Sequence, residues 1–321
     1  MLRYVLRRLL QMVPVLLWMT MITFMVMQLA PGDYFTNLQL NPQISRETLD
    51  RIRHTLGLDQ PWYIQYVQWL WSIVRLDFGF SFAWQVPVAW LLGSRMVNTL
   101  LLSLTSMTAA WMLAIPLGIY AATRQYRPGD HLLTVLALIG ISVPGFFAAL
   151  LLLYVAFYTG WLPIGGMTSP NFDLLSPLGR VLDVTHHLVL PTIVLGVLSV
   201  AGLMRQLRGN MLDVLRQDYV RMARAKGLAE RAVIYKHALR NALNPLVTIF
   251  GYELGGLLSG AALVEGVIGW PGLGQLTLEA VLKKDLYLIM GSVLMGGFML
   301  QMGNLAGDIM LAYLDPRIRY E

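Results

Sequence analysis

Apolar residues along this chain gather in long runs, which are separated by shorter polar segments. A helix needs about 20 predominantly apolar residues to cross the hydrocarbon core of a bilayer. Six runs come close to or exceed that length: Leu9–Ala30, Asn98–Ala122, Leu132–Tyr158, Leu188–Met204, Leu246–Val267 and Leu286–Leu314. The pattern therefore predicts an all-α membrane protein with six transmembrane helices.

Four prolines fall inside these runs, at Pro14, Pro116, Pro144 and Pro191. Neighbouring helices in a membrane bundle satisfy the carbonyl groups that a proline leaves free. We therefore expect each run to form one span.

The composition agrees with a membrane environment. Of the 321 residues, 56% are hydrophobic and 13% are charged, and the mean hydropathy is +0.59. A soluble domain carries about 25% charged residues, so this chain lacks the polar surface that a soluble globule needs. Cysteine is absent, which excludes disulfides, thiolate metal sites and thiol nucleophiles.

The distribution of Lys and Arg predicts the orientation of the spans. The first apolar run follows three arginines and is longer than the apolar core of a signal peptide, about 7–15 residues, so we interpret it as a retained span. Basic residues gather in every second connecting segment: Arg3, Arg7 and Arg8, then Arg124 and Arg127, then nine residues within 205–245, then Arg317 and Arg319. The short intervening loops are poorer in them, with Arg180 in one and Lys283 and Lys284 in another. The positive-inside rule then places both termini in the cytoplasm.

The segment 31–97 lies on the outer side in this topology. Ile44–Leu58 reads as a short amphipathic helix with Ile44, Leu49, Ile52 and Leu56 on one face, Ser45 near its start and Gly57 at its end. Aromatic residues crowd the following stretch, 62–84. Tyr and Trp collect at membrane interfaces, so we interpret the segment as a helical cap on the headgroups. A docking surface for an external partner is the alternative.

The segment 205–245 carries nine basic and three acidic residues. Asp218 is placed to cap a short helix through Lys226, and Gly227 to end that helix in the left-handed conformation. A second helix is predicted from Ala229 to Asn244, and Pro245 then opens the next span. Enforcing topology, binding anionic lipid or binding nucleic acid would each explain the basic residues. None of these roles needs a glycine between two short helices, whereas a hairpin that docks into another protein needs a fixed turn.

This segment resembles the cytoplasmic signature of permeases from binding-protein-dependent ABC importers, in particular the dipeptide and oligopeptide branch. The resemblance rests on Tyr219–Leu228 and His237–Ala242. The general signature reads Glu-Ala-Ala, three variable residues and Gly. Here Arg221-Met222-Ala223 replaces Glu-Ala-Ala, Gly227 matches, and the later proline lies further on, at Pro245.

The resemblance extends along nearly the whole chain as an ordered series of short matches. These are Tyr4–Leu10, Leu29–Asp33, Leu56–Pro61, Asp77–Ser81, Trp161–Gly166, His187–Pro191, Glu265–Gly274 and Asp315–Arg319. It implies a division into a first span (1–30), an outer segment (31–97), a five-helix permease core (98–314) with the coupling loop 205–245, and a cytoplasmic tail (315–321).

The resemblance also implies the function and the partners. The chain would be one permease subunit in a bacterial inner membrane, forming half of a translocation pathway for peptides. A second homologous permease, two ATPase subunits and an extracytoplasmic substrate-binding protein would complete the importer. The residues implied in ATPase coupling are Tyr219, Arg221, Ala223, Arg224, Ala225, Lys226, Gly227 and Leu228.

ATP chemistry is expected on the partners, since the sequence has no Gly-x-x-x-x-Gly-Lys-[Ser/Thr] phosphate loop. We expect no cofactor on this chain and no enzymatic activity of its own, with ATP and Mg on the ATPase subunits.

Further candidate residues lie at or near membrane depth, where ionisable groups are costly and usually functional. Glu253 and Asp308 are candidates for the pathway or a permease–permease contact. The structural alternative is a hydrogen bond to a neighbouring helix, with Asn304 as the candidate partner of Asp308. The outer-loop residues Glu265, Trp270, Pro271 and Gly272 form a turn that we expect to dip toward the bilayer and assist substrate release. His186 and His187 lack a matching carboxylate cluster, so we expect an interfacial or capping role rather than a metal site.

Two other classes of function stay open at this point. A self-contained secondary transporter would usually show two related halves, and no internal repeat is evident. A membrane-embedded enzyme would need a nucleophile and a base at matched depth, and no histidine lies within a predicted span. Within the resembling branch, relatives also move nickel complexes and oligosaccharides, so the pattern leaves the substrate open.

Overall fold

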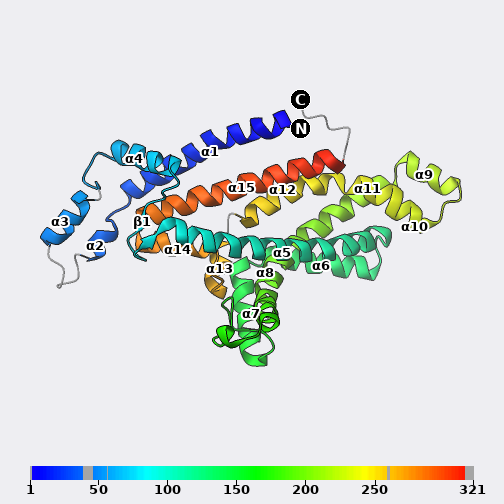
Figure 1. Ribbon diagram of the computed structural model, residues 1–321. Helices are drawn as coiled ribbons and strands as arrows, with labels where there is room; N and C mark the ends of the chain where they lie inside the picture. The colour runs from blue at the N-terminus through cyan, green and yellow to red at the C-terminus, as the bar shows by residue number, and fades with distance from the viewer. Residues whose placement is uncertain (1, 39–45, 56, 259–260, 315–321) are drawn as a thin grey trace.

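The computed structural model describes residues 2–38, 46–55, 57–258 and 261–314, and the elements are almost all helical (Figure 1). The first half contains α1 (Leu2–Leu29), α2 (Tyr34–Leu38), α3 (Arg46–Thr55), α4 (Trp62–Val74), β1 (Phe80–Ser81), β2 (Val86–Pro87), α5 (Val88–Thr123), α6 (Pro128–Ser142) and α7 (Gly145–Thr159). The second half contains a 3-10 turn (Phe172–Leu174), α8 (Pro177–Leu215), α9 (Asp218–Ala225), α10 (Glu230–Ala232), a π-helical segment (Val233–Ala238), α11 (Leu239–Ala242), α12 (Asn244–Leu258), α13 (Ala262–Ile268), α14 (Leu273–Lys283) and α15 (Leu286–Leu314).

Within the described residues, four helices are long and apolar enough to cross a membrane, namely α1, α5, α8 and α15. The number rises to six if each of two bent helix pairs, α6 with α7 and α12 with α13, counts as one span. The bounds of α15 agree with the predicted Leu286–Leu314. The helices α5 and α8 run well beyond the predicted Asn98–Ala122 and Leu188–Met204, because a hydropathy pattern reports the lipid-exposed length and not how far a helix continues past it.

The predicted span Leu132–Tyr158 is not one continuous helix, so the prediction is wrong on this point. The helices α6 and α7 meet at 103°, and α7 projects from the body of the molecule (Figure 1). Pro144 causes the break, since its ring excludes the helical hydrogen bond and pushes the preceding residue out of the helical region. Val143 accordingly has φ −88° and ψ 121°, and Pro144 has ψ 137°.

The helices α12 and α15 pack through their backbones. Gly251 and Gly255 on α12 face Gly307 and Gly303 on α15, in antiparallel order. A Cβ added at Gly307 would lie 2.3 Å from the Cα of Gly251. Two small-xxx-small patterns therefore form a close seam, of the kind that holds helices together in lipid.

The outer segment folds against one end of the bundle. Leu49 of α3 is buried with Phe35 and Phe82, and the Tyr66 hydroxyl on α4 donates to the Leu17 carbonyl of α1 at 2.9 Å. Gly57 follows α3 with φ +67°, as the sequence predicts. Ile44, Ser45 and Leu56 lie outside the described residues, as does the tail 315–321.

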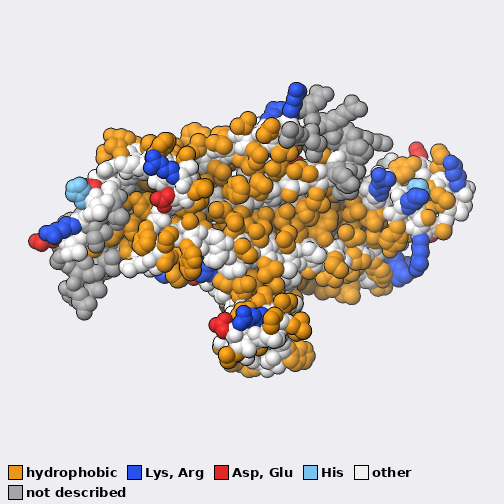
Figure 2. Space-filling model, viewed as in Figure 1, with side chains coloured by type: hydrophobic (Ala, Val, Ile, Leu, Met, Phe, Trp, Pro, Cys, Tyr) orange, Lys and Arg blue, Asp and Glu red, His pale blue; other side chains and the backbone are white. Residues whose placement is uncertain are grey.

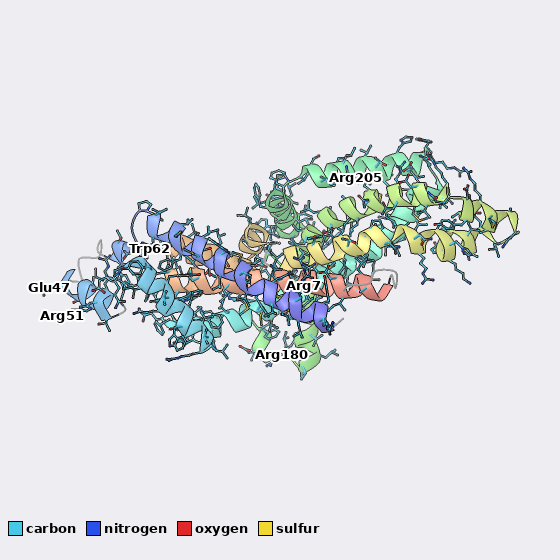
Figure 3. The ribbon with its side chains drawn as sticks, turned by 90° about the horizontal axis from the view of Figure 1, so that it is seen from above. Arg7, Glu47, Arg51, Trp62, Arg180 and Arg205 are labelled. Carbon is cyan, nitrogen blue, oxygen red and sulfur yellow. The ribbon has the colours of Figure 1, made fainter. Side chains whose placement is uncertain are left out.

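Charged residues are spread over separate ends of the molecule. Figure 3 shows Glu47 and Arg51 on α3 at the tip of the outer segment, far from Arg7 near the start of α1. In Figure 1 the hairpin of α9 to α11 lies at the end of the molecule opposite α3.

Candidate functional site

The hairpin formed by α9, α10, the π-helical segment and α11 extends beyond the helical bundle (Figure 1). Lys and Arg side chains gather on it, whereas hydrophobic side chains cover much of the body (Figure 2). We call residues 216–243 the hairpin. Its hydrogen bonds and packing show whether it is an irregular basic loop or an element with a defined conformation.

The turn of the hairpin has the hydrogen-bond pattern of a Schellman motif. Gly227 has φ +73°, and its N–H donates to the Arg224 carbonyl at 2.9 Å. The N–H of Leu228 donates to the Ala223 carbonyl at 3.4 Å. The predicted left-handed stop at Gly227 is thus present, and it fixes the direction in which the chain leaves α9.

Two details of the hairpin differ from the prediction. Asp218 is the first helical residue rather than the cap, and Gln217 before it makes no side-chain capping bond. The predicted second helix, Ala229–Asn244, is interrupted by the π-helical segment Val233–Ala238. Pro245 lies in the first turn of α12, as expected.

A small apolar core holds the hairpin together. Val220, Ala223 and Val233 are buried, with Val214 and Leu215 from the end of α8 packed against them. Ala223, one of the predicted coupling residues, therefore faces the inside of the hairpin. Its small side chain lets the two arms approach each other, and it is not available to a partner.

Polar side chains join the two arms across the glycine turn. Arg224 pairs with Glu230 through Nη2–Oε1 at 2.8 Å and Nε–Oε2 at 3.2 Å. The hydrogen bond from this guanidinium holds the pKa of the Glu230 carboxyl below its ordinary value. The amide of Asn241 donates to the Tyr219 hydroxyl at 2.8 Å. Arg224 and Tyr219 are thus engaged within the hairpin.

Large apolar side chains stay exposed on this basic element. Tyr219, Met222, Leu228 and Tyr235 are 42%, 57%, 43% and 58% exposed, and Arg221, Ala225, Lys226 and Gly227 are exposed beside them. The sequence analysis missed Met222 and Tyr235. The amphipathic period would have found Met222, three residues after Tyr219, whereas the π-helical segment shifts Tyr235 out of any regular period.

The hairpin is tied to the bundle at its base. The amide of Asn210 on α8 donates to the Ala242 carbonyl at 3.1 Å. One turn earlier, Leu207 packs on Gly118 of α5, where a Cβ would lie 3.0 Å from it. The first contact ties the α11 end of the hairpin to α8, and the second packs α8 against α5.

An ion pair near the base was not predicted. Arg208 of α8 binds Asp130 of α6 through Nε–Oδ1 at 2.6 Å and Nη2–Oδ2 at 2.8 Å. Asp130 is almost fully buried and also accepts from the Tyr126 N–H at 2.9 Å. The two residues are far apart in the chain, so no local pattern points to their pairing.

The outer turn, residues 265–275, is built around a buried carboxylate. Glu265 is 1% exposed, and its Oε2 accepts from the Gln275 N–H at 2.9 Å, at the start of α14. A Cβ at Gly272 would lie 2.4 Å from that oxygen. Glu265 therefore caps α14. A carboxylate near a helix N-terminus stabilises the helix, because it faces the positive end of the helix dipole.

Trp270 lies inside the protein, contrary to the expectation that this turn dips toward the bilayer. Its ring is fully buried, and its Nε1 donates to the Asn98 carbonyl at 3.2 Å. The Asn98 amide donates in return to the Pro271 carbonyl at 2.8 Å. The pattern of residues 265–274 predicts a turn correctly but does not reveal that α5, α7 and α8 pack around Trp270.

The two carboxylates predicted at membrane depth have different surroundings. Asp308 accepts from the Tyr4 hydroxyl at 2.7 Å and pairs with Arg8 at 2.9 Å, so it joins α15 to α1. Among the described residues, its partners are Tyr4 and Arg8 and not the expected Asn304. Glu253 is half-buried on α12, beside the indole of Trp111 on α5.

The two histidines bond to backbone carbonyls. His186 Nε2 lies 3.0 Å from the Trp161 oxygen, and His187 Nδ1 lies 2.8 Å from the Asp183 oxygen. In the part of the chain that the structure describes, no group of three or more His, Asp and Glu residues is placed to hold a metal ion.

Comparisons with known proteins cover the whole chain. Residues 114–320 match the family described as binding-protein-dependent transport system inner membrane component, and residues 1–103 match its N-terminal membrane component. The oligopeptide transport system permease protein AppB of Bacillus subtilis is 41% identical, over 99% of each chain. The dipeptide transport system permease protein DppB of Escherichia coli K12 is 35% identical, over 100% of each chain.

Among solved structures, inward-facing conformations of the MetNI methionine ABC transporter include a chain with the same fold. The TM-score is 0.53 at 17% identity, covering 70% of this chain and 97% of that one. The ordered series of short matches is thus part of a similarity that spans the chain from end to end. This chain belongs to the family of inner-membrane permease components of binding-protein-dependent transport systems.

Proposed function

We propose that this chain is a permease subunit of an ATP-driven importer in a bacterial inner membrane, and that it forms half of a translocation pathway for peptides. The family match and the full-length similarity to permeases named for oligopeptides and dipeptides support this assignment. A second homologous permease completes the pathway. A substrate-binding protein delivers the peptide on the outer side.

The hairpin is the contact with the ATPase subunits. The observation that carries this proposal is a rigid, outward-projecting turn that leaves Tyr219, Met222 and Leu228 exposed. Apolar and aromatic side chains at the centre of a patch with a charged rim are typical of protein interfaces. A basic loop that only set the topology would need neither the small core nor the fixed turn.

Motion of the ATPase subunits reaches the spans through the base of the hairpin. The hairpin is continuous with α8 at one end and with α12 at the other, and the Asn210–Ala242 bond closes the base. A displacement of α12 passes to α15 through their glycine seam. The two backbones touch there, so no flexible side chain between the helices absorbs the movement. ATP and Mg bind on the partners.

Glu253 borders the pathway on the α5–α12 face. A groove of about 450 Å³ on that face is lined by Trp111 and Phe250, whose rings meet edge to face at 5.4 Å. A half-buried carboxylate beside such a groove suits the cationic amino end of a peptide. Asp308 serves the fold instead, through its contacts with Tyr4 and Arg8.

Site-directed crosslinking tests the hairpin assignment, and the chain suits it because it has no cysteine. Met222→Cys and Tyr235→Cys should each crosslink to an ATPase subunit in the assembled complex. Asp213→Cys, exposed on α8 before the hairpin, is the matched control and should not. Absence of crosslinks at both hairpin positions in a complex that hydrolyses ATP would refute the contact.

A further inference from the structure

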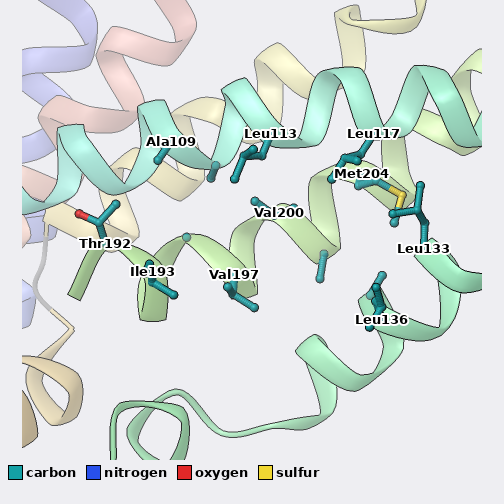
Figure 4. A pocket seen from close by; sticks show the side chains of 14 residues that line it. Ala109, Leu113, Leu117, Leu133, Leu136, Thr192, Ile193, Val197, Val200 and Met204 are labelled. Atoms are coloured by element: carbon teal, nitrogen blue, oxygen red, sulfur yellow. The ribbon is translucent and has the colours of Figure 1, made fainter. Parts of the chain in front are cut away.

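A narrow apolar groove runs between α5, α6 and α8, with a volume of about 350 Å³ (Figure 4). Its walls include Leu113, Leu117, Leu133, Leu136, Val197 and Val200. Thr192 is the single polar side chain among the described residues that line it, and its hydroxyl lies 3.5 Å from that of Thr105. Among its described lining side chains, the groove therefore offers a peptide or water only the Thr192 hydroxyl as a polar partner.

The break at Pro144 opens the groove sideways. Because α7 turns away from α6 by 103°, it contributes no residue to the lining of the groove. Leu136 and Val197 on the two sides of the opening are 53% and 50% exposed. In a membrane, this opening faces the hydrocarbon of the bilayer.

The length of the groove matches one leaflet. From Thr192 to Met204 it follows α8 for about 18 Å at about 1.5 Å per residue. The hydrocarbon core of a bilayer is about 30 Å thick, so one leaflet spans about 15 Å. An acyl chain that entered the opening would lie along the groove with its headgroup at one end.

One end of the groove is basic. Arg205 lies one helical turn beyond the lining residue Ala201 on α8, and Arg127 precedes α6. Both side chains are exposed, and neither forms an ion pair with another described residue. Arg208, about one turn beyond Arg205 on α8, is already neutralised by Asp130. This end leads along α8 to the hairpin, which is the side that the Lys and Arg distribution places in the cytoplasm.

We infer that this groove binds an anionic phospholipid of the cytoplasmic leaflet, with one acyl chain between α6 and α8 and its phosphate at Arg205 and Arg127. Apolar length and unpaired positive charge at one end are the two features that such a ligand needs. The site is independent of the peptide pathway and of the proposed ATPase contact. The bound lipid fills the space between α6 and α8 that α7 leaves open beyond the break at Pro144.

Lipid retention by the full-length chain tests the inference. The chain is purified from bilayers that contain equal amounts of phosphatidylglycerol and phosphatidylcholine and is then delipidated. Native mass spectrometry identifies the lipids that stay bound and measures their relative amounts. Wild-type protein should retain phosphatidylglycerol in preference to phosphatidylcholine. Arg205→Gln should lower that preference about fivefold, the factor expected for one charge near the membrane surface, and Arg205→Lys should keep it.

Two further variants separate the headgroup site from the groove. Val197→Phe fills the opening and should reduce retention of both lipids, because it leaves no room for the chain. Arg216→Gln, an exposed arginine at the end of α8, should change neither. Equal retention of the two lipids by the wild type, or an unchanged preference in Arg205→Gln that elutes as folded protein, would overturn the inference.

Discussion

Two turns of this molecule share a glycine in the left-handed backbone conformation but differ in the exposure of the residues around it. The short helices α9 and α13 both end at a glycine with φ +73°, Gly227 and Gly269. After Gly227 the chain presents exposed side chains, whereas after Gly269 it buries Trp270 completely. The same left-handed stop thus leads into exposed side chains in one place and into a buried ring in the other.

The space around the glycines makes this difference quantitative. A Cβ at Gly227 would meet nothing within 4 Å. A Cβ at Gly269 would meet only the Gly166 nitrogen, at 3.5 Å, but one at Gly274, further along the outer turn, would lie 2.8 Å from the backbone of Ala262. The hairpin turn is therefore fixed by its own hydrogen bonds, and the outer turn by packing from three helices. Substitutions should affect interaction in the first and folding in the second.

The largest expected effect is the loss of Trp270 from the outer turn. Trp270→Ala removes a fully buried ring and should cost about 3–5 kcal/mol, so the protein should accumulate poorly and lose thermal stability in detergent. Trp161→Ala removes a ring that is 81% exposed and should be nearly neutral. Melting curves followed by size-exclusion chromatography measure both. Equal melting temperatures for Trp270→Ala and wild type would remove the contrast between the two turns.

A smaller effect is expected at the buried carboxylate. Glu265→Gln keeps the shape but weakens the acceptor for the N-terminus of α14, and should cost about 1–3 kcal/mol. The partly buried Glu279 on the same helix has no recorded ion pair among the described residues and provides the control, Glu279→Gln. If both variants had the melting temperature of the wild type, Glu265 would not be the cap that stabilises the turn.

The smallest effect is expected at the ion pair of the hairpin. Arg224→Gln should cost about 0–1 kcal/mol, since both partners are largely exposed. The pKa of Glu230 is lowered in the folded hairpin, so the stabilisation is present at neutral pH and is lost as the pH falls through that lowered pKa, below the ordinary 4.5. Hydrogen exchange of the amides in 224–230 should therefore be faster in Arg224→Gln at pH 7. The difference should shrink as the pH is lowered below 4.5, and a difference that grew on acidification would contradict this assignment.

The sequence predicts those features of the fold that local patterns encode. The bounds of α15 follow from apolar length, and the conformations of Gly57 and Gly227 follow from their positions after short amphipathic helices. Pro144 shows the limit of that reasoning. A proline within an apolar run is compatible with a straight span, a kink or a sharp break, and only the packing of α6 on α8 and of α7 on α13 selects the break.

The candidate site was predictable in outline but not in its contacts. The order of basic residues and the glycine locate the hairpin, and they also suggest that Ala223 faces a partner, although it lies inside. The Arg208–Asp130 pair, the burial of Trp270 and the contacts of Asp308 depend on helices distant in the sequence. Residue types alone carry no information about such distances.

The central claim is that the fixed turn of the hairpin couples ATP hydrolysis to transport. Gly227→Val and Gly209→Val form a matched pair, since a Cβ meets nothing within 4 Å at either position, and only Gly227 has positive φ. A β-branched residue resists the left-handed conformation by about 1–2 kcal/mol, which distorts the turn without unfolding the bundle. The measurement is ATP-driven peptide uptake by the assembled importer, at equal amounts of inserted protein.

Gly227→Val should abolish uptake, either because the ATPase subunits no longer co-purify or because hydrolysis continues without transport. Gly209→Val should retain most of the uptake. Near-normal uptake with normal coupling in Gly227→Val would contradict the account.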